Sequence, residues 1–147
     1  MKNLNLFVAS ALVFILIMSS CSTNTSSESE KSEKKVYNAS VFFENLENGD
    51  TLQSPIHVKM GVEGMEVEAA GAFKEGFGHH HIIVNCTHIT EDSIVPADEK
   101  HIHFGKGQTN TDLELAAGNY CLTLQFADGF HKSYGEELSK TINIVVE

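Results

Sequence analysis

The chain has 147 residues and carries 20 Asp and Glu residues against 10 lysines and no arginine, so its formal net charge is −10 with histidine counted as neutral. This acidic balance argues against nucleic acid as a partner, because binding to phosphates needs a basic surface. The lack of arginine also removes the bidentate group that recognises phosphate and carboxylate ligands.

The N-terminus predicts a lipoprotein signal peptide over residues 1–20. Lys2 precedes an apolar run over residues 6–18, which is long enough for the core of a signal peptide and short for a bilayer span. Two serines then precede Cys21, as a lipoprotein signal peptidase requires. We expect lipidation of Cys21, a membrane anchor through that lipid, and a place in the bacterial cell envelope, at the outer membrane or the periplasmic face. An ordinary secretory signal is the alternative.

Residues 21–35 predict the lipidated cysteine followed by a disordered tether. The stretch after Cys21 consists of Ser, Thr, Asn, Glu and Lys, none of which builds a hydrophobic core. Its three glutamates balance its three lysines, so it shows no basic patch for lipids. Residues 36–147 then form one predicted domain, which holds six lysines and seventeen carboxylates and is therefore strongly acidic.

Apolar residues alternate with polar ones along this domain, as they do in half-buried strands. Glycine and asparagine turn signals separate these runs, and no stretch shows a sustained helical period. We expect strands near residues 41–43, 56–63, 79–86, 112–115, 120–126 and 142–146. The strand over residues 79–86 is apolar on both faces at Ile82–Val84, which is typical of a central strand. The pattern predicts an all-β fold, an antiparallel immunoglobulin-like β-sandwich.

Two cysteines remain in the domain, and their pairing stays open. An exported protein with an even number of cysteines favours a disulfide. However, side chains alternate along a strand, which places Cys86 inward with Ile82 and places Cys121 outward. A bridge between Cys86 and Cys121 would need a bulge or a different register. Two free thiols are the alternative.

Five of the eight histidines lie in two short tracts, His79-His80-His81 and His101-Ile102-His103. In an extended segment the first and third residues of each tract point to one face, about 6.6 Å apart. Imidazole nitrogen is a preferred ligand of zinc and copper, and two such pairs supply up to four ligands. The metal-site candidates are His79, His81, His101 and His103, with His131 added from a loop further along the chain.

The remaining residues near the tracts have simpler expected roles. His80 points to the opposite face and is expected in the core, held by a hydrogen bond. Asp98 and Glu99 are candidates to orient the ligand rings or to complete the coordination. His57 and His88 are isolated in the sequence and are expected to face solvent.

Other interpretations of the histidines remain open. Exposed histidines on strand rims are common without any metal, and clustered imidazoles also respond to pH near neutrality. No zinc-protease helix motif, serine-hydrolase elbow or phosphate loop is present. These residues favour a protein without catalytic activity and leave the enzyme question undecided.

The string Gly78-His79-His80-His81, followed by the motif of residues 96–109, PADEKHIHFGKGQT, resembles a bacterial family known as domain of unknown function 4399. The resemblance spans about residues 41–146 and includes the Phe42–Leu46 segment. It implies an exported, β-rich domain whose histidine tracts belong to the family pattern, and it implies no established activity.

Together these patterns predict an envelope-anchored lipoprotein that binds zinc or copper through its two His-x-His tracts, in scavenging, buffering or delivery. The alternative is a non-catalytic structural or protein-interaction module of the envelope that binds no metal.

Overall fold

The structure, a computed structural model, describes residues 37–85 and 87–147. The predicted signal peptide, the lipidated Cys21, the tether and Cys86 lie outside the described residues. No helix in the described ranges has the length and apolar character that crossing a bilayer requires.

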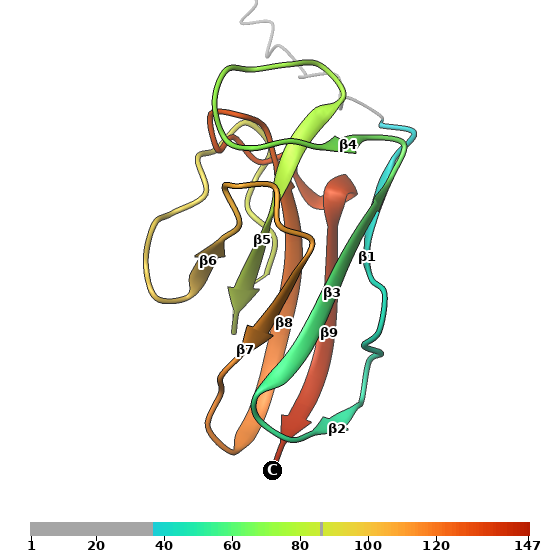
Figure 1. Ribbon diagram of the computed structural model, residues 1–147, viewed down its shortest axis with the longest axis vertical. Coiled ribbons are helices and arrows are strands. Elements are labelled where there is room, and N and C mark those ends of the chain that lie inside the picture. Colours follow the sequence, from blue (N-terminus) through green and yellow to red (C-terminus); the bar gives the residue numbers. More distant parts are fainter. Residues whose placement is uncertain (1–36, 86) are drawn as a thin grey trace, which may run out of the picture. The chain divides into compact units, whose positions relative to one another are not determined.

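The described residues form nine strands in two sheets (Figure 1). The smaller sheet has the order β1 (Ser40–Phe43), β3 (Ile56–Glu63), β7 (Asn110–Leu113). The larger sheet has the order β2 (Thr51–Leu52), β9 (Ser139–Val146), β8 (Gly118–Ala127), β5 (Phe77–Val84), β4 (Glu66–Val67), and β6 (His101–His103) also pairs with β5. One short 3-10 turn, η1 (Glu136–Leu138), precedes β9. The all-β prediction is confirmed, whereas the immunoglobulin-like topology stays a prediction.

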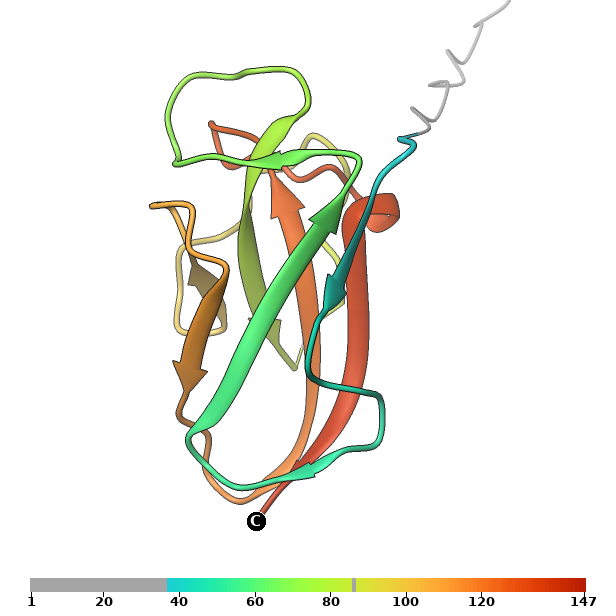
Figure 2. The same ribbon diagram turned by 45° about the vertical axis from the view of Figure 1, so that its right-hand side comes forward.

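The two sheets pack face to face, and the core lies between them. In the turned view of Figure 2, β3 (green) passes in front of β8 (orange) and β9 (red). The alternating apolar residues of these strands are buried, and they include Val58 and Met60 on β3, Leu124 and Phe126 on β8, and Ile144 on β9. Each such side chain contributes about 1.5–3 kcal/mol when it leaves water. The period-two pattern therefore selects the inner face of each sheet.

Two short pairings differ from the predicted antiparallel arrangement. β2 runs parallel to β9, and β4 runs parallel to β5, whereas the other described strand pairs are antiparallel. Parallel neighbours need a crossover connection rather than a hairpin. The chain provides this for β2, because β2 follows a strand of the other sheet. Both parallel pairings involve strands of only two residues, so the antiparallel scaffold carries the fold.

Strand β5 is central, as predicted, because β8 lies on one side of it and β6 on the other. Its outer face, opposite the core, is also covered. Gln125 of β8 lies on this face and is fully buried, with its side chain bonded to Ile89, Gly135 and Leu138. The segments around these residues therefore lie over the outer face, where His81 faces Gln125.

Cys121 lies on the same outer face, further along β8. It is a free thiol and is partly exposed. Its predicted partner Cys86 lies outside the described residues, so the disulfide stays an open prediction.

Candidate metal centre

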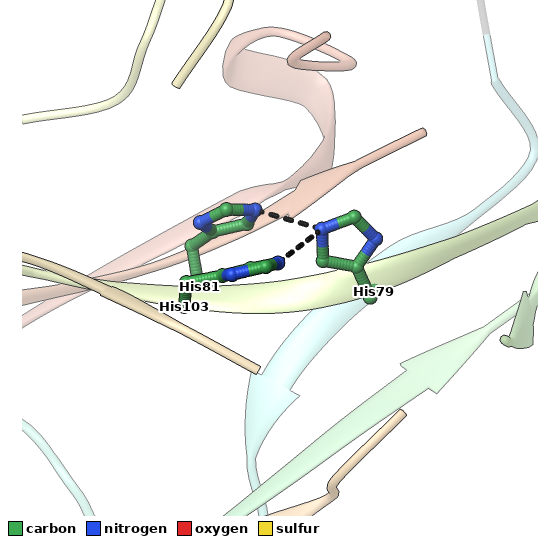
Figure 3. Close-up of side chains that lie close together, drawn as sticks. All are labelled: His79, His81 and His103. Atoms are coloured by element: carbon green, nitrogen blue, oxygen red, sulfur yellow. Dashed lines mark hydrogen bonds between the residues drawn. The ribbon is translucent and has the colours of Figure 1, made fainter. Parts of the chain in front are cut away.

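Strand geometry brings three histidines together on the outer face of β5 and β6. His79 and His81 point to this face because they stand two residues apart on β5. His103 lies directly opposite His81 in the antiparallel β5–β6 pair. The ligand nitrogens of these three residues all lie within 4.8 Å of one another. Figure 3 shows the rings of His81 and His103 turned towards His79.

A fourth imidazole comes from the loop after β8. His131 has a left-handed backbone, with φ of 67°, and its Nε2 lies 3.1 Å from Nε2 of His103. Its ring centroid is 5.0 Å from that of His79 and 6.1 Å from that of His81. His131 therefore joins the cluster on the His103 side.

Hydrogen bonds alone do not satisfy these nitrogens. Nε2 of His79 lies 3.1 Å from Nε2 of His81 and 3.2 Å from Nε2 of His103. An imidazole nitrogen presents either one hydrogen or one lone pair in the ring plane, so it makes one good hydrogen bond and not two. His103 meets the same limit, since its Nε2 also contacts His131. One cation among the rings would use every lone pair at once.

The spacing of the nitrogens also suits a metal ion. Zinc binds imidazole nitrogen at about 2.0–2.1 Å, and two nitrogens on one tetrahedral ion are then separated by about 3.3 Å. The three printed Nε2 separations, 3.1, 3.2 and 3.1 Å, are close to this value. The rings therefore need only a small adjustment to surround one ion.

Burial holds the cluster in the neutral, ligating form. Desolvation, together with the neighbouring imidazoles, lowers the pKa of His79 to about 4 and that of His81 to about 2. Burial also lowers the pKa of His103, with a further contribution from His131. Neutral imidazole is the form that binds metals. At neutral pH the three strand histidines therefore offer lone pairs without first losing a proton.

His101 lies apart from these three nitrogens. It stands on the same face of β6 as His103 but opposite Ile83, and its Nδ1 lies 2.7 Å from Oδ1 of Asp98. This hydrogen bond is the main cause of the lowered pKa of Asp98. Asp98 thus orients His101 rather than a ring of the cluster. The Nδ1 atoms of His79 and His81 have no hydrogen-bond partner among the described residues.

His80 lies in the core, as its position on β5 predicts. Its side chain is fully buried, and its ring centroid is 5.0 Å from that of Phe126. The hydrogen bond expected for it is absent, since neither ring nitrogen has a partner among the described residues. The inner face here is lined by apolar side chains, which offer no acceptor or donor. Burial consequently lowers the pKa of His80 to about 4.

We expect the metal-free protein to lose stability when the pH falls below 6.5, the ordinary pKa of histidine. Between 6.5 and the lowered pKa of about 4, the unfolded chain binds a proton at His80 that the folded chain does not. The free energy of unfolding therefore decreases as the pH falls through this window. From about pH 7 to about pH 5, His80 alone accounts for about 2 kcal/mol. Urea unfolding in the presence of a chelator measures this loss.

The variant His80→Leu provides the control for this pH dependence. It removes the titrating group and keeps an apolar side chain in the core. The loss of stability between the two pH values should shrink by about 2 kcal/mol. An equal loss in both proteins would contradict the assignment.

The two isolated histidines lie away from the cluster. His57 is exposed on β3, where its Nδ1 lies 2.7 Å from Oδ1 of Asp112. His88 is half-buried, not fully exposed as expected, because it follows the turn that leads over the outer face.

Sequence reasoning missed two residues that support the site. Gln125 is a polar residue in an apolar strand, and nothing in its pattern marks it as a buried hydrogen-bonding centre. Asp128 lies in the Asp-Gly turn signal, yet its contacts with the loop that carries His131 are not visible in the sequence.

Gly105 leaves room for the ring of His103. A Cβ atom at this position would overlap with Cε1 and Nε2 of that ring. We expect Gly105→Ala to displace the ring and weaken metal binding by about 10-fold or more, the range seen when the support of a ligand is altered. A competition titration with zinc measures the change.

Gly71→Ala is the matched control, because the nearest atom to its added Cβ is 4.0 Å away. It should bind zinc as tightly as the unaltered protein. Equal affinity of the Gly105 and Gly71 variants would show that the His103 ring takes no part in binding.

Fold and site together define a β-sandwich domain with an imidazole cluster on the outer face of its larger sheet. The family model of DUF4399, described as a domain of unknown function, matches residues 58–147, which is more than half of the chain. The chain belongs to this family, and the resemblance seen in its motifs is confirmed. The four clustered histidines all fall inside the matched region. No curated protein and no solved structure matches the chain.

Proposed function

We propose that this domain binds one divalent transition-metal ion, zinc or copper, through His79, His81, His103 and His131. The observation that carries the proposal is the convergence of four Nε2 atoms, linked by separations of 3.1–3.2 Å, from two strands and a loop. Three of these residues form a group able to hold an ion. The fourth comes from a segment about fifty residues further along the chain than His79.

The donor set favours borderline metal ions. Four imidazole nitrogens suit Zn²⁺ and Cu²⁺, whereas Cu⁺ prefers thiolate and thioether sulfur and Mg²⁺ prefers oxygen. Between the two favoured ions, Cu²⁺ binds a given nitrogen site more tightly. The net charge of −10 attracts cations towards the domain.

The accessibility of the cluster supports scavenging, buffering or delivery. His79 and His81 are buried, whereas His103 is exposed and His131 is half-buried. An ion would therefore be held firmly by the strand residues and reached from solvent on the other side. The proposal places the domain in the cell envelope, anchored through lipidated Cys21. That part of the proposal rests on the N-terminal sequence pattern alone.

The test is metal binding by the full-length protein, purified without a chelating resin or a histidine tag. Metal analysis and calorimetric titration with Zn²⁺ and with Cu²⁺ should give one equivalent per chain. The double variant His81→Ala plus His103→Ala should bind no stoichiometric metal, because it removes two of four ligands. The matched control, His57→Ala plus His88→Ala, removes two histidines outside the cluster and should bind one equivalent.

The outcome also decides between the two interpretations of the domain. If the unaltered protein binds neither ion, or if both double variants bind equally, the metal proposal is wrong. The domain would then be a structural or protein-interaction module. The exposed side chains of Phe73, Ile94 and Phe130 would be its first candidate contact residues.

A further inference from the structure

The loop that carries His131 is organised by one buried carboxylate. Asp128 directly follows β8 and is only 6% exposed. Its Oδ1 accepts a hydrogen bond from the backbone N–H of Phe130 at 2.8 Å and another from that of Lys132 at 2.9 Å. These two amides flank His131 on either side. The carboxylate therefore fixes the backbone just before and just after the candidate ligand.

The backbone of Asp128 closes the same loop. Its N–H donates to the carbonyl of Lys132 at 2.9 Å, and its carbonyl accepts from the N–H of His131 at 2.9 Å. Four hydrogen bonds thus run between Asp128 and residues 130–132. The two that involve the carboxylate are charge-assisted and are the stronger type.

His131 needs such support because its backbone is strained. Its φ of 67° lies in the left-handed region, where a side chain costs about 1–2 kcal/mol. The strand ligands need no such help, since sheet hydrogen bonds fix their backbones. Without its supporting contacts, the loop would relax to an ordinary conformation and carry the imidazole away from His103.

Asp128 also places a negative charge near the cluster. Its carboxylate is the one group that acts to raise the pKa of His79, against the larger lowering by burial. A buried negative charge at this position would partly balance the charge of a bound divalent ion. This favours a carboxylate over a neutral loop-forming residue.

We propose that Asp128 is a positioning residue that makes His131 the fourth metal ligand, by holding the backbone amides on either side of it. This inference rests on the proposed metal-binding function. It assigns Asp128 no direct contact with the ion. The carboxylate acts through His131, and its effect should vanish when His131 is absent.

The experiment is a double-mutant cycle on the full-length protein, with Zn²⁺ as the probe in competition titrations. Asp128→Ala should weaken binding about 10- to 100-fold, the usual effect of losing an outer partner of a ligand. His131→Ala should weaken binding at least as much, and Asp128→Ala plus His131→Ala should bind no more weakly than His131→Ala alone. Asp112→Ala, which removes an exposed carboxylate next to His57, is the control and should leave the affinity unchanged.

A second variant and a second readout separate positioning from a general structural effect. The amide oxygen of Asp128→Asn still accepts the two N–H groups, so this variant should bind more tightly than Asp128→Ala. With Cu²⁺ as the probe, electron paramagnetic resonance should show four nitrogen ligands in the unaltered protein and in Asp128→Asn. It should show one fewer in Asp128→Ala and in His131→Ala.

Two kinds of failure are distinguishable. If the unaltered protein binds no Zn²⁺ or Cu²⁺, the proposed function fails, and this inference fails with it. If the unaltered protein binds but the effects of Asp128→Ala and His131→Ala are additive, only this inference fails. It also fails if Asp128→Ala keeps four nitrogen ligands, or if Asp128→Asn binds as weakly as Asp128→Ala.

Discussion

His79→Ala is expected to abolish the thermal stabilisation that zinc gives to the protein, whereas His80→Leu is expected to retain it. The two residues are neighbours on β5 and are equally buried, but His79 faces the cluster and His80 faces the core. With free zinc at about 100 times the dissociation constant, binding adds about 2.7 kcal/mol to the stability of the folded state. In a domain of this size that corresponds to a rise of about 10 °C in Tm.

The measurement compares each variant with and without zinc, so that a change in basal stability does not enter the comparison. Differential scanning calorimetry gives both values of Tm. A rise of about 10 °C in the unaltered protein and in His80→Leu, with none in His79→Ala, is the expected result. Loss of the rise in His80→Leu alone would place the ion on the inner face and contradict the site described here.

Gln125→Met is expected to lower the free energy of unfolding by about 3 kcal/mol, because it leaves buried backbone groups without partners. The Gln125 amide donates to the carbonyls of Gly135 and Leu138 at 3.0 and 3.1 Å, and its oxygen accepts from Ile89 N–H at 3.0 Å. Methionine has a similar shape, so the loss reflects the hydrogen bonds and not a cavity. Urea unfolding of the metal-free protein measures the difference.

Gln53→Met is the matched control, since Gln53 lies on the surface between β2 and β3. The same chemical change should alter stability there by less than about 0.5 kcal/mol. Similar losses in the two variants would mean that the covering segments are not held by Gln125.

The strands of the core were predictable because burial imposes a simple period on the sequence. The alternation over residues 56–63 coincides with β3, and the expected strands over 120–126 and 142–146 fall within β8 and β9. The strands β2 and β4 were not predictable, because two residues are too few to show a period. Their pairing depends on where the rest of the chain places them.

The site was predictable in part for the same reason. The strand period places His79 and His81 on one face, and the register then brings His103 opposite His81. The sequence does not contain that register, and so it does not distinguish His103 from His101. Only the tertiary fold shows that Asp98 holds His101 and that the loop after β8 brings in His131.

The four clustered imidazoles belong to three segments that meet only after the long β5–β8 pair has formed. A nascent chain that ends before β8 carries at most the three ligands of β5 and β6, and it lacks the loop that holds His131. Full coordination would therefore follow completion of the larger sheet. The amount of tightly held ion would then report the fraction of molecules that have finished folding.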